Sequence, residues 1–382
     1  MAFAGRARPP VPPPDAPAVG VAAAATAPPD AAPPAPVAPA LWEGGLPVAL
    51  QSTPKGVGSL SAMSCNACHG TTHDQWAGGA HAQAWRAPLF QEALARVADA
   101  TACTGCHLPL ANQHSQLATG LRGGDPTRPE MAPNPLWDAG LMTEGVTCAA
   151  CHVRGDTVVS TRPSPGAPHP VAVSAELGTS ESCATCHQLT WPGADKPFYD
   201  TYGEWAASAY ASAGVRCQDC HMAPAAGPAA GGRFAAVAGH GFEADVRRAL
   251  TVLVQLDAPA AQRGSPLRAA VRVRNSGAGH AVPTGSPFVG MTLRVRLLGA
   301  DGKPLAADVR AEFSRTIAEA PPWPTLADTR LAPGAESTID ARFTVDQKTS
   351  AQLARLVVEA VRHVGPAEDP PIVLRDIPVP VR

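Results

Sequence analysis

The sequence predicts a multidomain chain: a loop-rich and mostly helical region followed by an all-β sandwich. Three observations predict this division. All ten cysteines lie between residues 60 and 245, apolar and polar residues alternate after about residue 248, and the first 40 residues hold 12 of the 42 prolines. The expected boundaries are 1–45 for a tether, 58–246 for the cysteine-bearing region and 247–382 for the sandwich.

The amino-terminal segment is rich in proline and alanine, as in "RPPVPPPDAPAV" and "PPDAAPPAPVAP". Such a composition cannot form an apolar core and favours a disordered, partly polyproline II tether. The stretch "AVGVAAAATA", behind Arg6 and Arg8, is also similar to a degenerate signal-peptide apolar region. Both interpretations of this segment stay open.

Charge and hydropathy argue against two classes of partner. The formal net charge is −2, and no basic excess of the kind that nucleic-acid binding needs is present. The sequence contains no run of 18 apolar residues, so it predicts no membrane-spanning helix. Aromatic residues make up only 5% of the chain, beside 42 prolines and 35 glycines, so side chains alone supply little bulk for an interior.

Every cysteine belongs to a Cys-x-x-Cys-His unit. A histidine would follow any given Cys-x-x-Cys by chance only about 3% of the time, so five in five is no accident. The five units are Cys65, Cys68 and His69; Cys103, Cys106 and His107; Cys148, Cys151 and His152; Cys183, Cys186 and His187; and Cys217, Cys220 and His221.

This spacing suits covalent haem attachment. Two thiols three positions apart on a helical turn can form thioethers with the two haem vinyl groups, and the next histidine becomes an axial iron ligand. Zinc sites do not need a histidine at that fixed position, and a disulfide framework would show varied spacings. We predict five covalently attached c-type haems, whose rings would fill the interior, in an exported protein on the periplasmic or extracellular side of the membrane.

Sixth iron ligands can come from the other histidines. The chain has 12, of which seven lie outside the motifs, enough for histidine on both faces of every haem. We predict five of them as distal ligands. They are His81, His114, His169, His240 and His280, whereas His73 lies too close to His69 and His363 falls in a predicted strand.

A near-repeat in the sequence supports His81. The stretch "QWAGGAHAQAW" contains His81, and "EWAASAYASAG" at 204–214 copies its Trp-Ala spacing with Tyr210 in place of the histidine. The copies suggest a duplicated helix before a haem motif, in which Tyr210 is either a packing residue or a neighbour of a haem face.

The loop "RNSGAGHAVPTGSPF", residues 274–288, supports His280. Gly277 and Gly279 allow close approach of the backbone to a porphyrin, and Pro283 stiffens the exit of the loop. These features suit a fixed imidazole that reaches from the sandwich into the haem-bearing region.

Several stretches together resemble the cytochrome c-552/c-554-type multihaem cytochromes. They are "WAGGAHA", "GVTCAACHV", "SCATCHQ", "EWAASAYASAGVRCQDCHM", "GHGF" and "NSGAGHAVPTG", between about residues 60 and 300. Gly79 departs from the serine usual in the first of them. The resemblance implies that His81, His240 and His280 are distal ligands. It also implies periplasmic or surface electron carriage, with reductases or oxidases among the relatives.

The cysteine-free part predicts an immunoglobulin-like β-sandwich. About seven short alternating stretches are separated by Gly, Pro, Asp and Asn turns. No Ser-nucleophile, P-loop or dinucleotide-binding motif accompanies them. The stretches are "ALTVLVQL", "LRAAVRVRN", "MTLRVRLLG", "VRAEFSRT", "STIDARFTV", "LARLVVEAV" and "PIVLRDIPV".

Three functional hypotheses follow. The first is a non-enzymatic electron carrier with low reduction potentials, whose partners are other cytochromes or quinol-linked donors. The second is a reductase or oxidase of a small nitrogen or sulfur compound, which needs one haem with an open iron position. The third is a haem-bearing scaffold subunit. Oligomerisation is compatible with each.

Overall fold

The computed structural model describes residues 40–42, 46–96, 101–124, 128–191, 193–229, 233–320 and 322–382. The chain divides into two compact units, Met1–Ala35 and Pro36–Arg382. The first unit, and most of the predicted tether at 1–45, lies outside the described residues. Both the cysteine-bearing region and the strand-rich region belong to the second unit.

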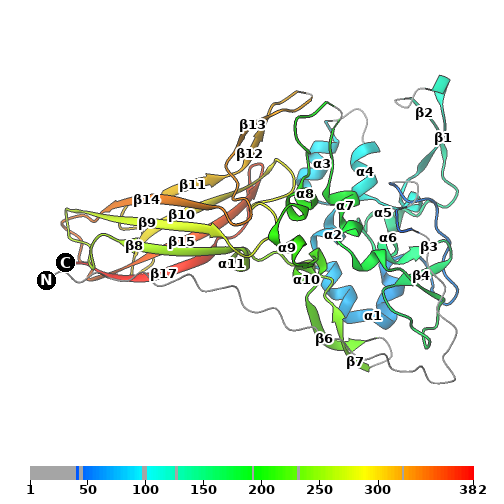
Figure 1. Cartoon of the computed structure of the whole chain (residues 1–382), viewed down its shortest axis with the longest axis horizontal. Helices are drawn as coiled ribbons and strands as arrows, with labels where there is room; N and C mark the ends of the chain where they lie inside the picture. Colours follow the sequence, from blue (N-terminus) through cyan, green and yellow to red (C-terminus); the bar gives the residue numbers. More distant parts are fainter. Residues whose placement is uncertain are drawn as a thin grey trace. The chain divides into compact units, whose positions relative to one another are not determined.

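The first Cys-x-x-Cys-His motif lies inside a helix of 16 residues, whereas each of the other four motifs lies on a short helix that ends at the motif histidine (Figure 1). Helices this short are marginal by themselves, so they depend on tertiary contacts. The helices are α1 (Ala62–Ala77), α2 (Ala80–Gln83), α3 (Pro88–Leu94), α4 (Thr101–His107), α5 (Ala139–Met142), α6 (Cys148–His152), α7 (Glu181–His187), α8 (Thr201–Ala206), α9 (Ala209–Ser212), α10 (Cys217–His221) and α11 (Val246–Ala249), with 3-10 turns η1 (Ala111–Gln113), η2 (Arg122–Gly124) and η3 (Glu176–Gly178).

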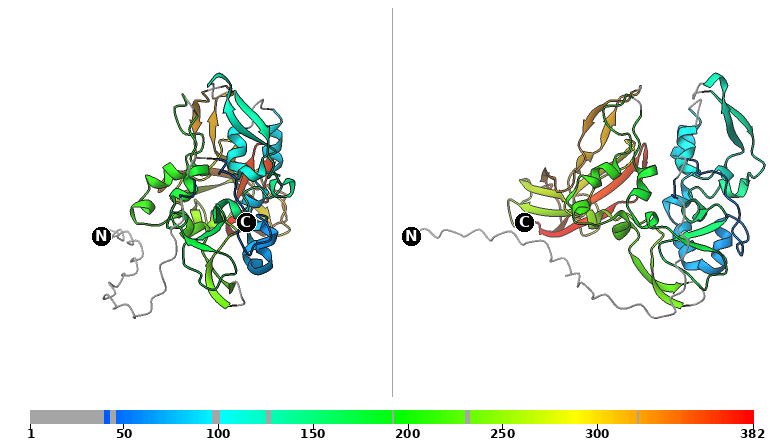
Figure 2. Two further views of the ribbon diagram at one scale, coloured as in Figure 1. Left: turned by 90° about the vertical axis from the view of Figure 1, so that its right-hand side faces the viewer. Right: turned by 45° about the vertical axis from the view of Figure 1, so that its right-hand side comes forward.

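Three small sheets stand among these helices, and the sequence did not predict them. The β1–β2 hairpin extends away from the helices in the views of both Figure 1 and Figure 2. The sheets consist of β1 (Gln116–Leu121) with β2 (Pro129–Pro133); β3 (Val153–Arg154), β4 (Thr157–Ser160) and β5 (Val171–Val173); and β6 (Pro224–Ala229) with β7 (Arg233–Ala238).

Apolar packing in the motif-bearing region is divided into small clusters. One joins Val48, Leu110, Leu141 and Val153 with two alanines, and another centres on Trp76. Clusters of this size agree with the low aromatic content of the chain. No helix of the described segments combines the length and apolarity that crossing a membrane requires.

The strand-rich region consists of two antiparallel sheets, hereafter the two-sheet region. One sheet has the order β14-β9-β8, and the other has β11-β10-β15, with β16 and β17 both paired to β15. The strands are β8 (Leu250–Leu256), β9 (Pro266–Asn275), β10 (Val289–Gly299), β11 (Val309–Phe313), β14 (Glu336–Thr344), β15 (Leu353–Val364), β16 (Ala367–Glu368) and β17 (Ile372–Pro380), beside a hairpin of β12 (Arg315–Ile317) and β13 (Thr325–Asp328).

Alternation builds the core of the two-sheet region. Val271 and Val273 of β9 pack with Leu293 and Val295 of β10 and with Phe343 of β14, so both sheets contribute to one buried cluster. Each of the seven predicted strands is present. The β12–β13 hairpin and β16 were missed because strands of two to four residues are too short to show alternation.

Two residues of the predicted tether pack against the motif-bearing region. Leu41 is fully buried and its backbone N–H donates to Glu176 Oε2 at 2.8 Å. The indole N–H of Trp42 donates to the carbonyl of Ser182 at 3.1 Å, and the Arg154 guanidinium lies over its ring. The described end of this segment is therefore ordered by a leucine and a tryptophan that a Pro/Ala composition alone does not suggest.

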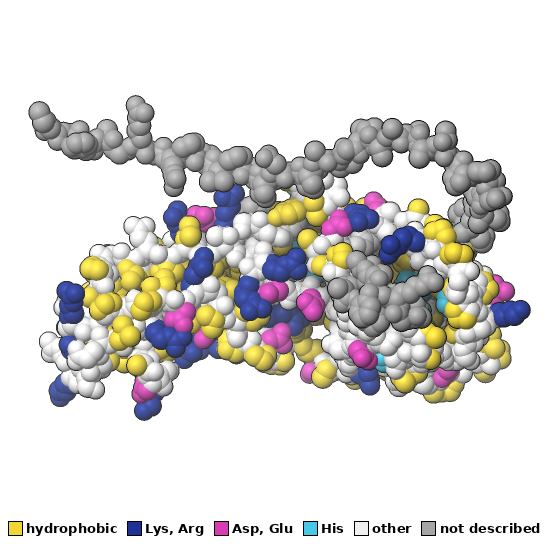
Figure 3. Space-filling view, turned by 90° about the horizontal axis from the view of Figure 1, so that it is seen from below, with side chains coloured by type: hydrophobic (Ala, Val, Ile, Leu, Met, Phe, Trp, Pro, Cys, Tyr) yellow, Lys and Arg dark blue, Asp and Glu magenta, His cyan; other side chains and the backbone are white. Residues whose placement is uncertain are grey.

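Charged side chains of both signs are interspersed on the face shown in Figure 3, and histidine atoms reach the surface in the motif-bearing part. This mixture follows from the near balance of 30 basic and 32 acidic residues.

Candidate functional site

The cysteines of different motifs lie in contact with one another. Hydrogen bonds link Cys65 to Cys148 and Cys106 to Cys186. A third links Cys183 to Cys217. In each pair the contact raises the pKa of one thiol, as for Cys148. The neighbouring thiol and the burial of the pair both disfavour a second thiolate. No disulfide joins any of the ten cysteines, all of which the structure describes.

These contacts form two groups of motifs, and an electrostatic effect links the two groups. The first motif meets the third, the second meets the fourth, and the fourth meets the fifth. Cys151 of the third motif also lies near enough to Cys186 of the fourth to raise its pKa, after the larger effects of Cys106 and burial. The fourth motif, on α7, is therefore the meeting point of the cluster.

Three motif histidines face a histidine from elsewhere in the chain. The ring centroids are 6.2 Å apart for His187 and His81, 6.0 Å for His152 and His240, and 6.1 Å for His221 and His280. An iron bound to one nitrogen of each ring, at about 2.0 Å per bond, would hold two imidazoles with their centroids about 6 Å apart. The three pairs therefore have the separation that two-sided ligation of a haem iron needs.

Backbone carbonyls hold several of these imidazoles by Nδ1. His152 Nδ1 pairs with the carbonyl of Val159 at 2.9 Å, His221 with that of Glu243 at 2.9 Å, and His240 with that of Ala238 at 2.8 Å. Metal-ligating histidines commonly bond their second ring nitrogen in this way, which fixes the ring and leaves Nε2 for the metal. These residues therefore fit c-type haem.

Burial favours the neutral form of several of the paired imidazoles. It lowers the pKa of His81 to about 4, with a further contribution from His187, and it lowers the pKa of His152 to about 4. Burial also lowers the pKa of His280. Because only a neutral imidazole binds a metal, these directions favour ligation at neutral pH.

The first motif has a different environment. His69 has its pKa lowered by burial and then by the nearby His169. His169 comes from the stretch before β5, and its Nδ1 lies 3.4 Å from the carbonyl of Pro170. The structure brings these two predicted residues near each other, but no ring contact between them is found of the kind that joins each of the three facing pairs.

The second motif lacks a facing imidazole among the described residues. Phe90 stacks on His107, with centroids 3.6 Å apart and planes inclined by 5°, and His107 Nδ1 bonds to the carbonyl of Ala84. His114 instead directs its Nε2 to the carbonyl of Leu108 at 2.7 Å. The structure therefore does not bring His114 opposite a motif histidine, because a local backbone contact occupies the nitrogen that would bind iron.

The remaining two histidines have other contacts. His363 lies on β15, as predicted, and its Nε2 pairs with Glu312 at 2.6 Å. His73 packs near Trp76, and its side chain is only 12% exposed. It is thus largely buried within α1.

The loop between β9 and β10 is fixed from inside the two-sheet region. Asn275, fully buried, donates from Nδ2 to the carbonyl of His280 at 2.8 Å and to that of Leu331 at 2.9 Å. Gly277 lies so close to the carbonyl of Arg248 that a Cβ would clash. The backbone beside His280 is therefore held by Asn275 and by the close approach of Gly277 to Arg248, whereas the approach of these glycines to a porphyrin stays a prediction.

Phe242 contacts the non-motif histidines of two different pairs. Its ring lies edge-on to His81 at 4.3 Å and to His240 at 6.1 Å. Its φ of 50° is the left-handed conformation that phenylalanine rarely adopts. Sequence reasoning singled out "GHGF" for its histidine and missed the phenylalanine.

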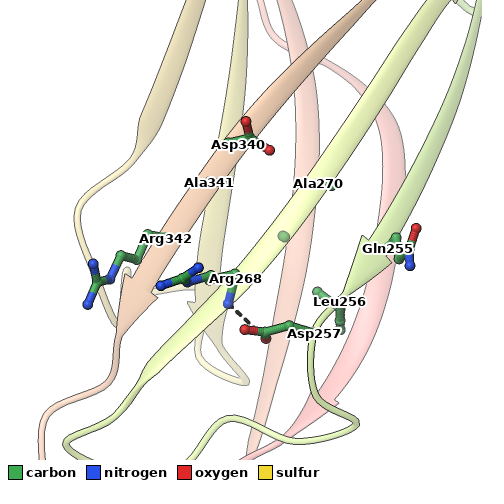
Figure 4. A pocket seen from close by; sticks show the side chains of 9 residues that line it. Gln255, Leu256, Asp257, Arg268, Ala270, Asp340, Ala341 and Arg342 are labelled. Carbon is green, nitrogen blue, oxygen red and sulfur yellow. Dashed lines mark hydrogen bonds between the residues drawn. The ribbon is translucent and has the colours of Figure 1, made fainter.

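A surface depression of about 620 Å³ lies away from the motifs, on strands β8, β9 and β14 (Figure 4). It is lined by residues such as Gln255, Asp257 and Arg342, and the backbone N–H of Arg268 donates to Asp257 Oδ1 at 3.0 Å. Its lining includes neither cysteine nor histidine, so the histidine pairs remain the candidate site.

Comparison with known proteins also points to c-type cytochromes. Residues 64–122 match the family model of cytochrome c554 and c-prime. The solved structure of a penta-heme cytochrome c552 from Thermochromatium tepidum is similar at 20% identity and a TM-score of 0.55, over 86% of this chain and 100% of that chain. The resemblance to multihaem c-type cytochromes is thereby confirmed, and the second of these findings concerns the fold alone.

A second solved structure is only weakly similar to this chain. The CARDB domain of a Pyrococcus furiosus protein in complex with di-metal ions matches at 17% identity and a TM-score of 0.20, over 35% of this chain and 87% of that chain. No curated protein matches this chain.

Proposed function

We propose that this multihaem c-type cytochrome binds five haems through its five Cys-x-x-Cys-His motifs and relays single electrons between redox partner proteins. In this proposal the ten cysteines form the thioethers, and the five motif histidines are the proximal ligands. His81, His240 and His280 are distal ligands. His169 is the candidate for the first motif, and His114 would serve only if its ring left the carbonyl of Leu108.

One observation carries the proposal: thiol contacts join the first motif to the third and the second and fifth motifs to the fourth, and Cys151 of the third motif lies near enough to Cys186 of the fourth to raise its pKa. A haem supplies a one-electron ferric/ferrous couple, and the protein supplies its placement. Motifs that touch one another suit transfer from centre to centre, and facing histidines close the iron to substrate.

We further propose that the two-sheet region is an immunoglobulin-like sandwich that serves as a scaffold for His280. The whole protein would be located on the periplasmic or extracellular side of the membrane, because c-type haem is attached outside the cytoplasm. Its partners would be other cytochromes or quinol-linked donors, without nucleic acid.

Mass spectrometry and voltammetry test the relay. Protein matured in a host that makes c-type cytochromes should carry five haem masses, and four or fewer would contradict the count. The holoprotein on an electrode should show reversible one-electron waves that nitrite and sulfite leave unchanged.

The surroundings of His107 favour a second candidate, a reductase or oxidase. No imidazole of the described chain faces it, and Tyr199 lies half-buried near Cys106 and Cys103, with its pKa raised by desolvation and then by those thiols. An open iron position beside a phenol would suit reduction of a small nitrogen or sulfur compound. A catalytic current with nitrite or sulfite would support this candidate over the relay.

A further inference from the structure

The two near-repeats of the sequence form the same local structure. The indole N–H of Trp76 donates to the carbonyl of Val146 at 2.8 Å, and that of Trp205 donates to the carbonyl of Val215 at 2.9 Å. Each valine precedes the first cysteine of a motif by two residues. Each tryptophan therefore braces the entry to one motif, the third in the first copy and the fifth in the second.

Backbone contacts extend the correspondence. The N–H of Val146 donates to the carbonyl of His81 at 3.0 Å, and the N–H of Val215 donates to the carbonyl of Tyr210 at 2.9 Å. Tyr210 thus occupies the place of His81, but its hydroxyl donates to the carbonyl of Ser276 at 2.9 Å. The second copy uses this position to hold the loop of His280.

The residue before each tryptophan contacts the loop that carries the facing histidine. Gln75 Oε1 accepts the backbone N–H of His240 at 2.9 Å. Glu204 Oε2 accepts the backbone N–H of Ala281, next to His280, at 3.0 Å. In both copies, therefore, a side-chain oxygen of the residue before the tryptophan fixes the main chain at the histidine that faces a motif histidine.

Glu204 is restrained further than Gln75. Its Oε2 also accepts from Thr284 Oγ1 at 2.9 Å, and its Oε1 pairs with Arg330 at 2.8 Å. The side chains of Glu204 and Arg330 are 12% and 11% exposed. A carboxylate held at both oxygens has little freedom to move, so the backbone that bonds to it is held as well.

We propose that Glu204 is a positioning residue that holds His280 opposite His221, and that Gln75 does the same for His240 opposite His152. This inference rests on the proposed function, since it takes both histidines as iron ligands. The oxygen acceptor, and not the charge, performs the positioning, because the first copy achieves it with a neutral amide.

Low-temperature EPR of the oxidised holoprotein tests this inference. His280→Ala and His240→Ala first identify the low-spin signals of the two centres. Glu204→Ala should then lose the signal that His280→Ala loses and keep the others, whereas Glu204→Gln, which retains an oxygen acceptor, should keep all of them. Glu336→Ala, at an exposed carboxylate of β14, is the matched control and should match the wild type.

The outcomes test the positioning role of Glu204 and the ligand assignment of His280 separately. A wild-type spectrum from Glu204→Ala, or equal loss in Glu204→Gln, would overturn the positioning role of the acceptor oxygen. An unchanged spectrum in His280→Ala would instead overturn the ligand assignment itself. If Glu204→Ala does not accumulate with five haems, Gln75→Ala decides: loss of the His240 signal supports the inference, and a wild-type spectrum refutes it.

Discussion

The imidazole rings of His221 and His280 lie nearly parallel, inclined by 18° with centroids 6.1 Å apart. His221 ends the helix of the last motif, whereas His280 lies in the loop between β9 and β10 of the two-sheet region. A shared iron would therefore join two regions that are otherwise held by contacts such as that between Glu204 and Arg330.

His280→Ala should leave five haems attached, because the cysteines and proximal histidines are untouched. One centre should change from low-spin to high-spin and bind carbon monoxide when reduced, since the iron loses one axial ligand. The loop between β9 and β10 should also become more sensitive to proteolysis. EPR, carbon monoxide difference spectra and limited proteolysis measure the three effects.

His363→Ala is the matched control for this prediction. His363 lies in the same region and pairs only with Glu312 among the contacts found for its ring, so its removal should leave the haem spectra unchanged. An unchanged spectrum with no carbon monoxide binding in His280→Ala would make the loop histidine a turn residue.

Low reduction potentials are expected for the centres with a histidine on each face. Methionine in place of one histidine raises the potential of a haem, and Met222 follows His221 directly at the end of α10, where it cannot reach the opposite face of the same haem. A spectroelectrochemical titration should give potentials that are mainly negative relative to the hydrogen electrode. Strongly positive values with a methionine-iron charge-transfer band would contradict the histidine ligation.

The sequence supports some parts of this architecture better than others. The strand of Val271 and Val273 could be predicted because alternation reports one buried face. His81, His240 and His280 could be singled out because each lies in a stretch that resembles the cytochrome c-552/c-554-type multihaem cytochromes. The structure places each of them opposite a motif histidine.

Counting histidines could not reveal where each ring points. His114 was expected as a ligand, yet its Nε2 is bonded to the carbonyl of Leu108, six residues away. The contact of Glu204 with Ala281 spans two regions, and nothing local to either residue announces it. The recurrence of Gln75 and Glu204 before the two tryptophans was the one available signal.

Phe343→Ala should destabilise the two-sheet region. Phe343 is fully buried in the core that both sheets share, so its loss leaves a cavity and costs about 3–5 kcal/mol of unfolding free energy. Denaturant unfolding followed by far-UV circular dichroism measures the loss. The haem content should stay at the wild-type value, since the motifs lie elsewhere, and Leu253→Ala, at a half-exposed position of β8, should cost far less.

Phe242→Leu should disturb two centres at once. The ring of Phe242 lies edge-on to His81 and also borders His240, so its removal frees both imidazoles to rotate about their iron bonds. We expect the EPR signals that His81→Ala and His240→Ala identify to shift or broaden, while the His280 signal stays. Phe242→Gly, which also relieves the left-handed backbone, should show the same shifts with higher stability than Phe242→Leu. Phe288→Leu, at an exposed ring, is the control, and a shift confined to the His280 signal would refute this role of Phe242.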